Sequence, residues 1–484
     1  MEITDAKNKN LLFQYFDRLT RYPRYPEDLS SDAFLRLIRS MGYHPFQDKS
    51  YNVILQLPPS PGLEEAPRLI LQGHLDMVCL KEEGLDHDFS IDPIRIVEEG
   101  GWLRAKGTSL GADNSMGLSM MLALLDDPIP LPQTRFIFTN GKVRGMHGAK
   151  NLESRFLDAD ILVNLDSKIE GIVGTSSSGG MIGSLEIPLK RSSFSKERAQ
   201  VRIRVDGLRG GNAGDDILDV RSNAIKVLAD FLWRIDQNSQ ILINSFYGNT
   251  YESVIPSFAQ AIISFPVEEN ERVFEAMAGV RDELSDNLLK SDPDFRFTWD
   301  QGTSLDPPMD HPSSQRLLNL IMMLPHGVFT MKAGTDQIES SDNLYSVITE
   351  KQSARIRTSL RTSSVEKGKE LEDKILQIVQ TFSGTGTFEE GDPAWIRRER
   401  SPVRDLYFKV YSQMTGNQAG EGTLHSANEC GIFQRKNPEL DLISIGPDMK
   451  DTQTLKERVS MDSSLRTYLL LRRLIREIAQ TRRE

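Results

Sequence analysis

Four side chains occupy positions where zinc chemistry could be carried out. His74 and Asp76 lie two residues apart at the end of an apolar run. Asp113 ends a Gly-rich segment, and Asp166 ends a second apolar run. Imidazole and carboxylate are ligands that zinc prefers, and alternate residues of a strand share a face, so Asp76 can orient the His74 ring. The spacing of His74 and Asp76 suits a metal ligand with its orienting carboxylate, but a capped turn histidine is at least as common, and the structural alternative for Asp113 is an N-cap carboxylate.

The elements that must position these residues alternate between strands and helices. We expect strands at 68–78, 134–140 and 159–166, and a helix at 114–127. Apolar strands that alternate with helices predict an α/β fold with a mixed, largely parallel sheet and flanking helices. Ligands of such sheets gather beyond the carboxyl ends of the strands, which is where the candidate ligands lie.

The character of the sequence changes near residue 187, where charged strands and amphipathic helices begin. A chain of 484 residues exceeds what a single core usually supports, so two domains are expected. We predict a catalytic-type domain formed by 1–186 and 393–484, with an α+β lid domain inserted at 187–392.

Composition excludes several classes of function. The formal net charge is −11 and no long basic block occurs, which disfavours nucleic acid and anionic membranes as partners. No apolar run approaches the ~18 residues of a membrane span, and the N-terminus lacks a basic-then-apolar signal pattern, so we expect a cytoplasmic protein. Cys79 and Cys430 are far apart and lack a histidine partner, so we expect plain reduced thiols.

Further motifs follow the candidate ligands in an ordered series along the chain. They are GMHGA (145–149), GTSSSGG (174–180), GLRGGNAG (207–214), LPHGVFTM (324–331), ESSDNL (339–344), LRTSS (360–364), GDPAW (391–395) and LHSANECGIF (424–433). Together with the segments around His74, Asp113 and Asp166, this series resembles Xaa-His dipeptidase (aminoacyl-histidine dipeptidase, peptidase D), a di-zinc metallopeptidase family related to carboxypeptidase G and aminoacylase. The resemblance extends over nearly the whole chain.

The resemblance implies a site in which one carboxylate bridges two zinc ions. Asp113 matches the bridging ligand, while His74 and Asp166 complete the first site and Asp76 matches its orienting carboxylate. The family also implies dipeptide substrates and dimerisation through the lid domain. Arg361 and His425 match positions beside the substrate, although a solvated arginine and a structural loop histidine are the alternatives.

Four positions depart from the family where chemistry is done. Lys142 stands where the family has its general base, and Val143 stands where it has a glutamate ligand of the second zinc. Gln453 replaces the C-terminal histidine ligand, and Asn212 replaces a histidine of the lid that stabilises the developing oxyanion. Valine has no lone pair and a glutamine amide is a poor zinc ligand. The second site is therefore expected to be lost.

Lys142 has three possible roles. It could act as a replacement base with a depressed pKa, its ammonium could fill the place of the missing cation and neutralise Asp113, or it could be solvated; we favour the second. His147 and Glu429 lie in neighbouring motifs, and we expect His147 at the surface and Glu429 in a loop beside the pocket.

We therefore expect a dipeptidase-like protein that is catalytically impaired or inactive and holds one zinc at most, or none. It would bind dipeptides, another small ligand or a partner, and form a homodimer through the lid. The alternatives are an active dipeptidase that uses one zinc, since three protein ligands and an open position make a workable site, and a non-enzymatic dimerisation or regulatory module.

Overall fold

The computed structural model describes residues 2–82, 84–193, 197–214, 216–219, 221–335, 337–425 and 427–483, with side chains described from residue 6 onward. The chain divides into two compact units. The first unit comprises Met1–Ser176, Trp395–Leu424 and Asn428–Glu484, and the second comprises Ser177–Ala394 and His425–Ala427. Independent domains with boundaries at 187 and 393 stay a prediction.

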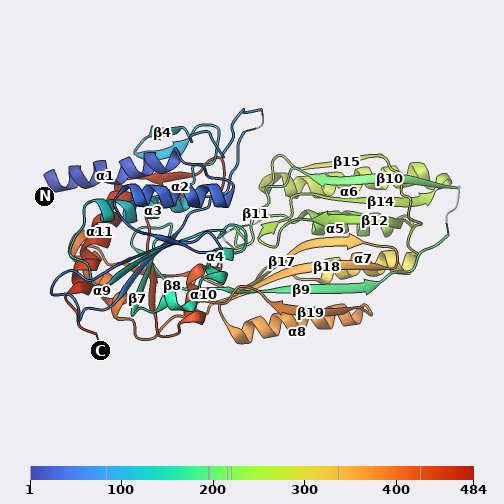
Figure 1. The fold of residues 1–484 in the computed structure, drawn as a ribbon. Helices are drawn as coiled ribbons and strands as arrows, with labels where there is room; N and C mark the ends of the chain where they lie inside the picture. The colour runs from blue at the N-terminus through green and yellow to red at the C-terminus, as the bar shows by residue number, and fades with distance from the viewer. Residues whose placement is uncertain are drawn as a thin grey trace. The chain divides into compact units, whose positions relative to one another are not determined.

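The first unit is built on an eight-stranded sheet with a parallel centre (Figure 1). Its strand order is β1-β2-β6-β3-β7-β21-β8-β20, and β6, β3, β7 and β21 run parallel, while β2 and β8 pair antiparallel with this central block. The strands are β1 (Phe46–Gln47), β2 (Val53–Leu57), β6 (Thr134–Thr139), β3 (Leu69–His74), β7 (Ile161–Asn164), β21 (Asp441–Ser444), β8 (Ile172–Ser177) and β20 (Gly420–Leu424). The predicted mixed, largely parallel sheet is confirmed.

Helices cover this sheet and deliver Asp113 to its edge. Helix α3 (Ala112–Asp126) packs against β3 and against α1 (Glu2–Thr20). Its sequence is apolar all round, which is typical of a helix buried on every side, and every residue from Ala112 to Leu125 is buried. The remaining helices are α2 (Glu27–Ser40), α4 (His147–Asn151), α9 (Pro402–Thr415), α10 (Glu429–Lys436) and α11 (Met461–Ala479). A smaller sheet joins β4 (Ile96–Glu99), β5 (Trp102–Ala105), β22 (Met449–Lys450) and β23 (Arg458–Ser460).

The second unit is an antiparallel sheet with helices packed on it, so the predicted α+β character is confirmed. The strand order is β15-β10-β14-β12-β17-β18-β9-β19, with β16 also paired to β17. The strands are β9 (Gly179–Pro188), β10 (Arg198–Asp206), β12 (Leu242–Asn249), β14 (Ala259–Pro266), β15 (Arg296–Gln301), β16 (Gly327–Met331), β17 (Ile338–Thr349), β18 (Ser353–Thr362) and β19 (Thr385–Glu390). The helices are α5 (Ala224–Asp236), α6 (Asn270–Ser291), α7 (His311–Met323) and α8 (Val365–Thr381). Strands β11 (Gly211–Asn212) and β13 (Val254–Ile255) form a separate pair.

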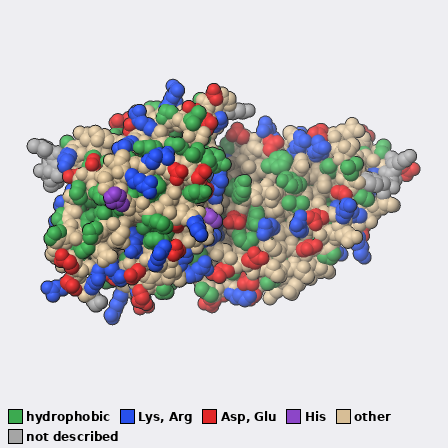
Figure 2. Space-filling view, in the orientation of Figure 1, with side chains coloured by type: hydrophobic (Ala, Val, Ile, Leu, Met, Phe, Trp, Pro, Cys, Tyr) green, Lys and Arg blue, Asp and Glu red, His purple; other side chains and the backbone are tan. Residues whose placement is uncertain are grey.

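Acidic and basic side chains are interspersed over the visible face of each unit rather than gathered by sign (Figure 2). A nucleic-acid footprint requires clustered lysine and arginine, and this face does not offer one. Within the described part of the chain, each helix is too short or too polar to cross a membrane.

One acidic side chain lies inside the second unit. Asp342 on β17 is 1% exposed and accepts a hydrogen bond from the Thr358 hydroxyl. Its cationic neighbour is Lys226, whose ammonium donates to the carbonyls of Ile321 (2.7 Å) and Met322 (3.0 Å) at the end of α7. Burial raises the pKa of Asp342 to about 7. Asp342 is therefore a buried acid that folding keeps protonated near neutral pH.

Replacing Asp342 by asparagine should remove a pH dependence of stability. Because the pKa of Asp342 rises from 3.8 to about 7 on folding, its contribution is fully present below pH 3.8 and is lost as pH rises through 7. At about 1.4 kcal/mol per pKa unit, the loss is roughly 4 kcal/mol at most. We expect Asp342→Asn to gain stability relative to wild type between about pH 5 and pH 8, measured by urea unfolding at both pH values. An identical difference at both would contradict this assignment.

Candidate functional site

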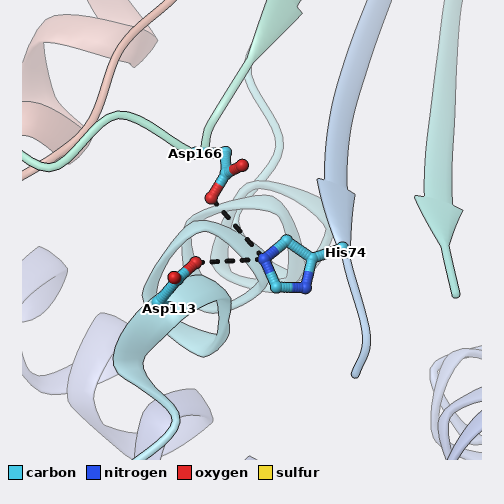
Figure 3. Close-up of side chains that lie close together, drawn as sticks. All are labelled: His74, Asp113 and Asp166. Carbon is cyan, nitrogen blue, oxygen red and sulfur yellow. Dashed lines mark hydrogen bonds and ion pairs between the residues drawn. The ribbon is translucent and has the colours of Figure 1, made fainter. Parts of the chain in front are cut away.

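Three predicted ligands converge at one edge of the parallel sheet (Figure 3). His74 ends β3, Asp166 lies just beyond the neighbouring parallel strand β7, and Asp113 begins α3. The His74 Nε2 atom lies 3.0 Å from Asp113 Oδ1 and 3.5 Å from Asp166 Oδ1. All three residues are buried, and their donor atoms lie within 4.8 Å of one another. Such a set can hold a metal ion, and it is the one group of this kind in the described part of the chain.

Asp76 orients His74 from the irregular segment that follows β3 rather than from the strand. The expected strand at 68–78 ends at His74, because β3 covers Leu69–His74. The His74 Nδ1 atom lies 2.9 Å from the backbone carbonyl oxygen of Asp76 and 3.4 Å from its Oδ1 atom. The other Asp76 oxygen accepts a hydrogen bond of 2.8 Å from the backbone N–H of Val143. The backbone carbonyl is therefore the nearer partner of the imidazole, which strand alternation alone did not predict.

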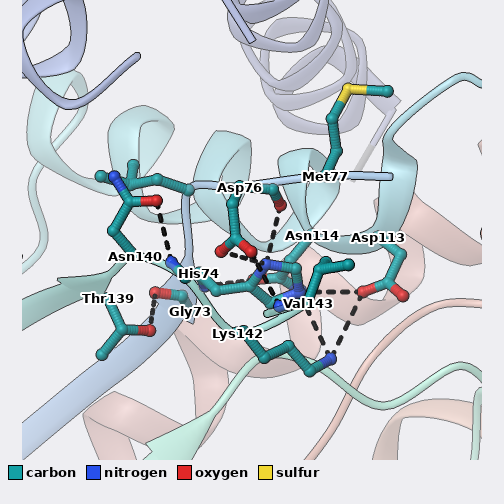
Figure 4. Close-up of polar contacts among 12 residues, drawn as sticks. Gly73, His74, Asp76, Met77, Asp113, Asn114, Thr139, Asn140, Lys142 and Val143 are labelled. Atoms are coloured by element: carbon teal, nitrogen blue, oxygen red, sulfur yellow. Dashed lines mark hydrogen bonds and ion pairs between the residues drawn. The ribbon is translucent and has the colours of Figure 1, made fainter. Parts of the chain in front are cut away.

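Lys142 extends toward His74 and Asp113 (Figure 4), and it also contacts Asp166. Its Nζ atom is 2.6 Å from Asp166 Oδ2, 3.4 Å from His74 Nε2 and 3.8 Å from Asp113 Oδ1. Its side chain is 14% exposed, which contradicts a solvated position. Burial opposes the charge, but Asp113 and Asp166 outweigh it and raise the pKa of Lys142 above its ordinary value. The geometry favours an ammonium that neutralises carboxylates over a neutral amine that acts as a base.

The second oxygen of Asp113 meets other donors. Lys168 Nζ lies 3.3 Å from Asp113 Oδ2, and the Gln453 side-chain amide donates to the same oxygen at 3.2 Å. Burial opposes ionisation, but the charges of Lys142 and Lys168 and the hydrogen bond from His74 hold the pKa of Asp113 well below its ordinary value. Sequence reasoning missed Lys168, although it follows Asp166 by two residues in the NLDSK segment.

The charged groups also set the state of His74. Burial and the Lys142 ammonium oppose its protonation, but hydrogen bonds to Asp113, Asp166 and Asp76 outweigh both and raise the pKa of His74 well above its ordinary value. In the absence of a bound cation, these contacts favour an imidazolium. A metal ligand must offer a neutral imidazole nitrogen, so metal binding here would release a proton.

Glu457 supports the loop that carries Asp113. Its two carboxylate oxygens accept hydrogen bonds from the backbone N–H groups of Gly111 (2.9 Å) and Asp113 (3.1 Å). Gly111 has φ of 68°, a left-handed conformation that favours glycine. Burial, reinforced by the Asp113 charge, raises the pKa of Glu457 to about 7. Glu457 was not singled out from the sequence, although it lies in the KERV segment four residues after Gln453.

Glu429 and Cys430 are buried supports of the site rather than an open lining of a pocket. Glu429 is fully buried at the start of α10, and its Oε2 atom accepts hydrogen bonds from Gln72 (2.8 Å) and Thr139 (3.1 Å). Burial raises the pKa of Glu429. Burial also raises the pKa of the neighbouring Cys430 thiol well above its ordinary value, so its reactive thiolate form is disfavoured.

Val143 and Gln453 present N–H donors to Asp76 and Asp113 in this arrangement rather than metal-ligand atoms. Val143 offers a backbone N–H to Asp76 and an alkyl side chain that is 38% exposed. Gln453 presents its amide N–H, a donor, to Asp113. His147 is exposed at the start of α4, as expected.

Three predicted residues lie in the second unit rather than in the first. The imidazole of His425 lies between two hydroxyls, with Nε2 2.7 Å from Ser341 Oγ and Nδ1 3.1 Å from Ser178 Oγ. Arg361 on β18 pairs in register with Ser341 on β17. Asn212 uses its side-chain oxygen to accept the Gly214 N–H at 2.7 Å. His425 and Arg361 therefore belong to one neighbourhood, whereas Asn212 stabilises its own turn.

Comparisons with known proteins place this site in context. The family model described as "Peptidase dimerisation domain" (M20_dimer) matches residues 203–292. A cytosol non-specific dipeptidase from Escherichia coli strain K12 is 28% identical over 460 residues, covering 94% of this chain and 95% of that one. The structure of aminoacylhistidine dipeptidase from Vibrio alginolyticus matches with a TM-score of 0.73 and 26% identity over 98% of this chain and 97% of that one.

A tripeptidase structure from Staphylococcus aureus shares the fold, with a TM-score of 0.56 and 15% identity over 98% of this chain and 99% of that one. Together these comparisons confirm the resemblance to Xaa-His dipeptidases that the motifs indicated. The chain is similar to dipeptidases of the M20 metallopeptidase type over nearly its whole length, and it has a buried group of residues that could hold metal.

The Lys142 and Asp166 pair should be energetically coupled. Removing one partner of a buried ion pair typically costs ~3–5 kcal/mol, because the other charge stays buried and uncompensated. We expect Lys142→Met to destabilise by this order. The double variant Lys142→Met with Asp166→Asn should be more stable than the sum of the single effects predicts. Chemical unfolding of all four proteins in chelator measures the coupling; additive effects would show that the 2.6 Å contact contributes nothing.

Proposed function

We propose that this chain is an Xaa-His dipeptidase-like protein whose hydrolytic chemistry is impaired or lost, with the peptidase fold kept for binding. This proposal rests on the contacts of Lys142. At the position where the family places its general base, this chain has an ammonium 2.6 Å from Asp166. An ammonium has no lone pair, so it cannot accept a proton from the attacking water.

The donor set supports one metal ion at most. His74, Asp113 and Asp166 have the ligand types and spacing of a single zinc site. When bound there, zinc would act as a Lewis acid on a substrate carbonyl. The second position keeps Asp113 alone, because Val143 offers an alkyl group and Gln453 an N–H donor. The residues therefore fit one ion and do not fit the pair that the family uses.

The remaining groups support binding of a small peptide. In the second unit, His425 and Arg361 offer an imidazole and a guanidinium, and a guanidinium grips a carboxylate bidentately. The match of 203–292 to a peptidase dimerisation domain supports a homodimer formed by the lid. The name of the Escherichia coli relative supports dipeptides as ligands and a cytoplasmic location. Asn212 keeps an amide at the oxyanion position but carries no charge, so it would weaken transition-state binding.

A one-metal dipeptidase is the second candidate. It is favoured by the convergence of His74, Asp113 and Asp166, since three protein ligands with an open fourth position are a common catalytic arrangement. This candidate requires a base. Asp76 is held by His74 and by the Val143 N–H, which leaves it poorly placed for that role.

Turnover of Xaa-His dipeptides decides between the two candidates. Loss of a general base alone typically costs ~10²–10⁴-fold in rate. With Zn²⁺ or Mn²⁺ added, we expect kcat/KM to lie at least that far below the value of the Escherichia coli dipeptidase assayed beside it. Metal analysis of the same samples should give one ion per chain or fewer. Robust hydrolysis that a chelator abolishes, with two ions per chain, would refute the proposal.

Restoring the family residues should rebuild the second site. We expect the triple variant Lys142→Glu, Val143→Glu and Gln453→His to bind two zinc ions per chain, because a carboxylate at 143 and an imidazole at 453 then join Asp113 and the ammonium at 142 is gone. Zinc would displace Lys168, whose side chain is 27% exposed. The matched control is the double variant Val143→Glu and Gln453→His, which keeps the ammonium and should bind less metal. Metal content measured after dialysis provides the readout, and a triple variant that matches wild type would contradict the proposed cause.

A further inference from the structure

We infer that Lys142 is a built-in counter-ion that occupies the first metal position, so that the site is complete without metal. This inference rests on the proposed function and extends it from one ion at most to none. It would make the protein a metal-independent member of a metal-dependent fold.

The Lys142 ammonium lies close to all three candidate ligands. Among its contacts are a donor atom of each candidate ligand, at 2.6 Å for Asp166, 3.4 Å for His74 and 3.8 Å for Asp113. A surface lysine that pairs with one acid would not reach all three. A cation bound by these residues must lie between the same atoms, so an ion and the ammonium compete for one place.

Both carboxylate oxygens of Asp113 already have partners within this chain. One oxygen faces His74 at 3.0 Å and Lys142 at 3.8 Å, and the other faces Lys168 at 3.3 Å and Gln453 at 3.2 Å. A carboxylate that bridges two metals must turn one oxygen to each ion. Here each oxygen already meets an ammonium of this chain, and Asp113 needs no metal on either side.

Because Asp113 and Asp166 are buried, their negative charges must be balanced by positive charge nearby. Asp113 and Asp166 are 4% and 5% exposed, and buried carboxylates are costly unless paired. In the absence of metal, Lys142 and Lys168 provide the pairing. A divalent ion that entered would place like charge beside the Lys142 ammonium, and at ~4 Å such charges repel strongly even at an effective dielectric of ~20. Lys142 therefore stabilises the metal-free site and opposes the ion.

Two substitutions of Lys142 separate charge from bulk. Lys142→Met keeps a long side chain without charge, and Lys142→Arg keeps the charge on a larger head group. Wild type, both variants and Lys49→Met are dialysed against Zn²⁺, then measured for zinc content and for the shift of Tm by zinc and by EDTA. Lys49 is an exposed lysine of the same unit and serves as the control.

We expect no stoichiometric zinc and no shift of Tm for wild type, Lys142→Arg and Lys49→Met. Lys142→Met should have a lower Tm in EDTA, bind about one zinc per chain and regain stability with zinc, since a ligand that binds only the folded state raises Tm. A folded Lys142→Met that binds no zinc, or a Lys142→Arg that binds as much as Lys142→Met, would overturn the inference.

Wild type alone also decides the question if Lys142→Met does not fold. One zinc per wild-type chain with a rise of Tm overturns the inference and leaves the proposed function standing, because one ion without a base is what that proposal allows. Two zinc ions with robust dipeptide hydrolysis overturn both. Wild type that stays free of zinc, with a Tm insensitive to EDTA, supports the inference.

Discussion

The arrangement of the site follows from one electrostatic constraint: buried carboxylates must be paired with positive charge. Asp113 and Asp166 lie at the end of the parallel sheet with little access to water, and each requires a cation within contact distance. Metal ions meet this need in the metallopeptidases that the chain resembles. In this chain, the contacts of Lys142 and Lys168 meet it with lysine side chains. An ammonium balances charge as an ion does, but it has no open coordination position and does not activate water.

The scaffold around these charges is intact. Parallel strands β3 and β7 bring His74 and Asp166 to the same edge, and the buried helix α3 presents Asp113 to the same group. Glu457 holds the Asp113 loop by two backbone N–H groups. The glycines and apolar residues of the motifs are kept, whereas the four departures fall on positions that bind metal, accept a proton or stabilise the oxyanion in the family. A fold can persist in this way because its stability comes from packing and backbone hydrogen bonds.

Binding of a peptide and its hydrolysis depend on different groups of the protein. Binding of a peptide needs donors and complementary charge, and within the second unit Arg361 and His425 offer groups of this kind. Hydrolysis needs in addition a base and an electrophile that act in the transition state. Under the proposed function, replacement of Glu at positions 142 and 143 removes the groups that hydrolysis needs and leaves those that binding needs.

Much of the architecture could be predicted from the sequence, because hydrophobic periodicity and ordered motifs are local properties. The mixed sheet and the helix after Asp113 followed from the periodicity, and the meeting of His74, Asp113 and Asp166 followed from the strand ends and the family resemblance. The resemblance also identified Lys142, Val143 and Gln453 as replacements. Tertiary structure alone decided where the Lys142 ammonium points, which is toward Asp166 and the whole ligand set. It also decided that Lys168 and Glu457 join the site and that Asp76 orients His74 chiefly through its carbonyl. These contacts join residues distant in sequence through flexible side chains, and no local pattern specifies such a meeting.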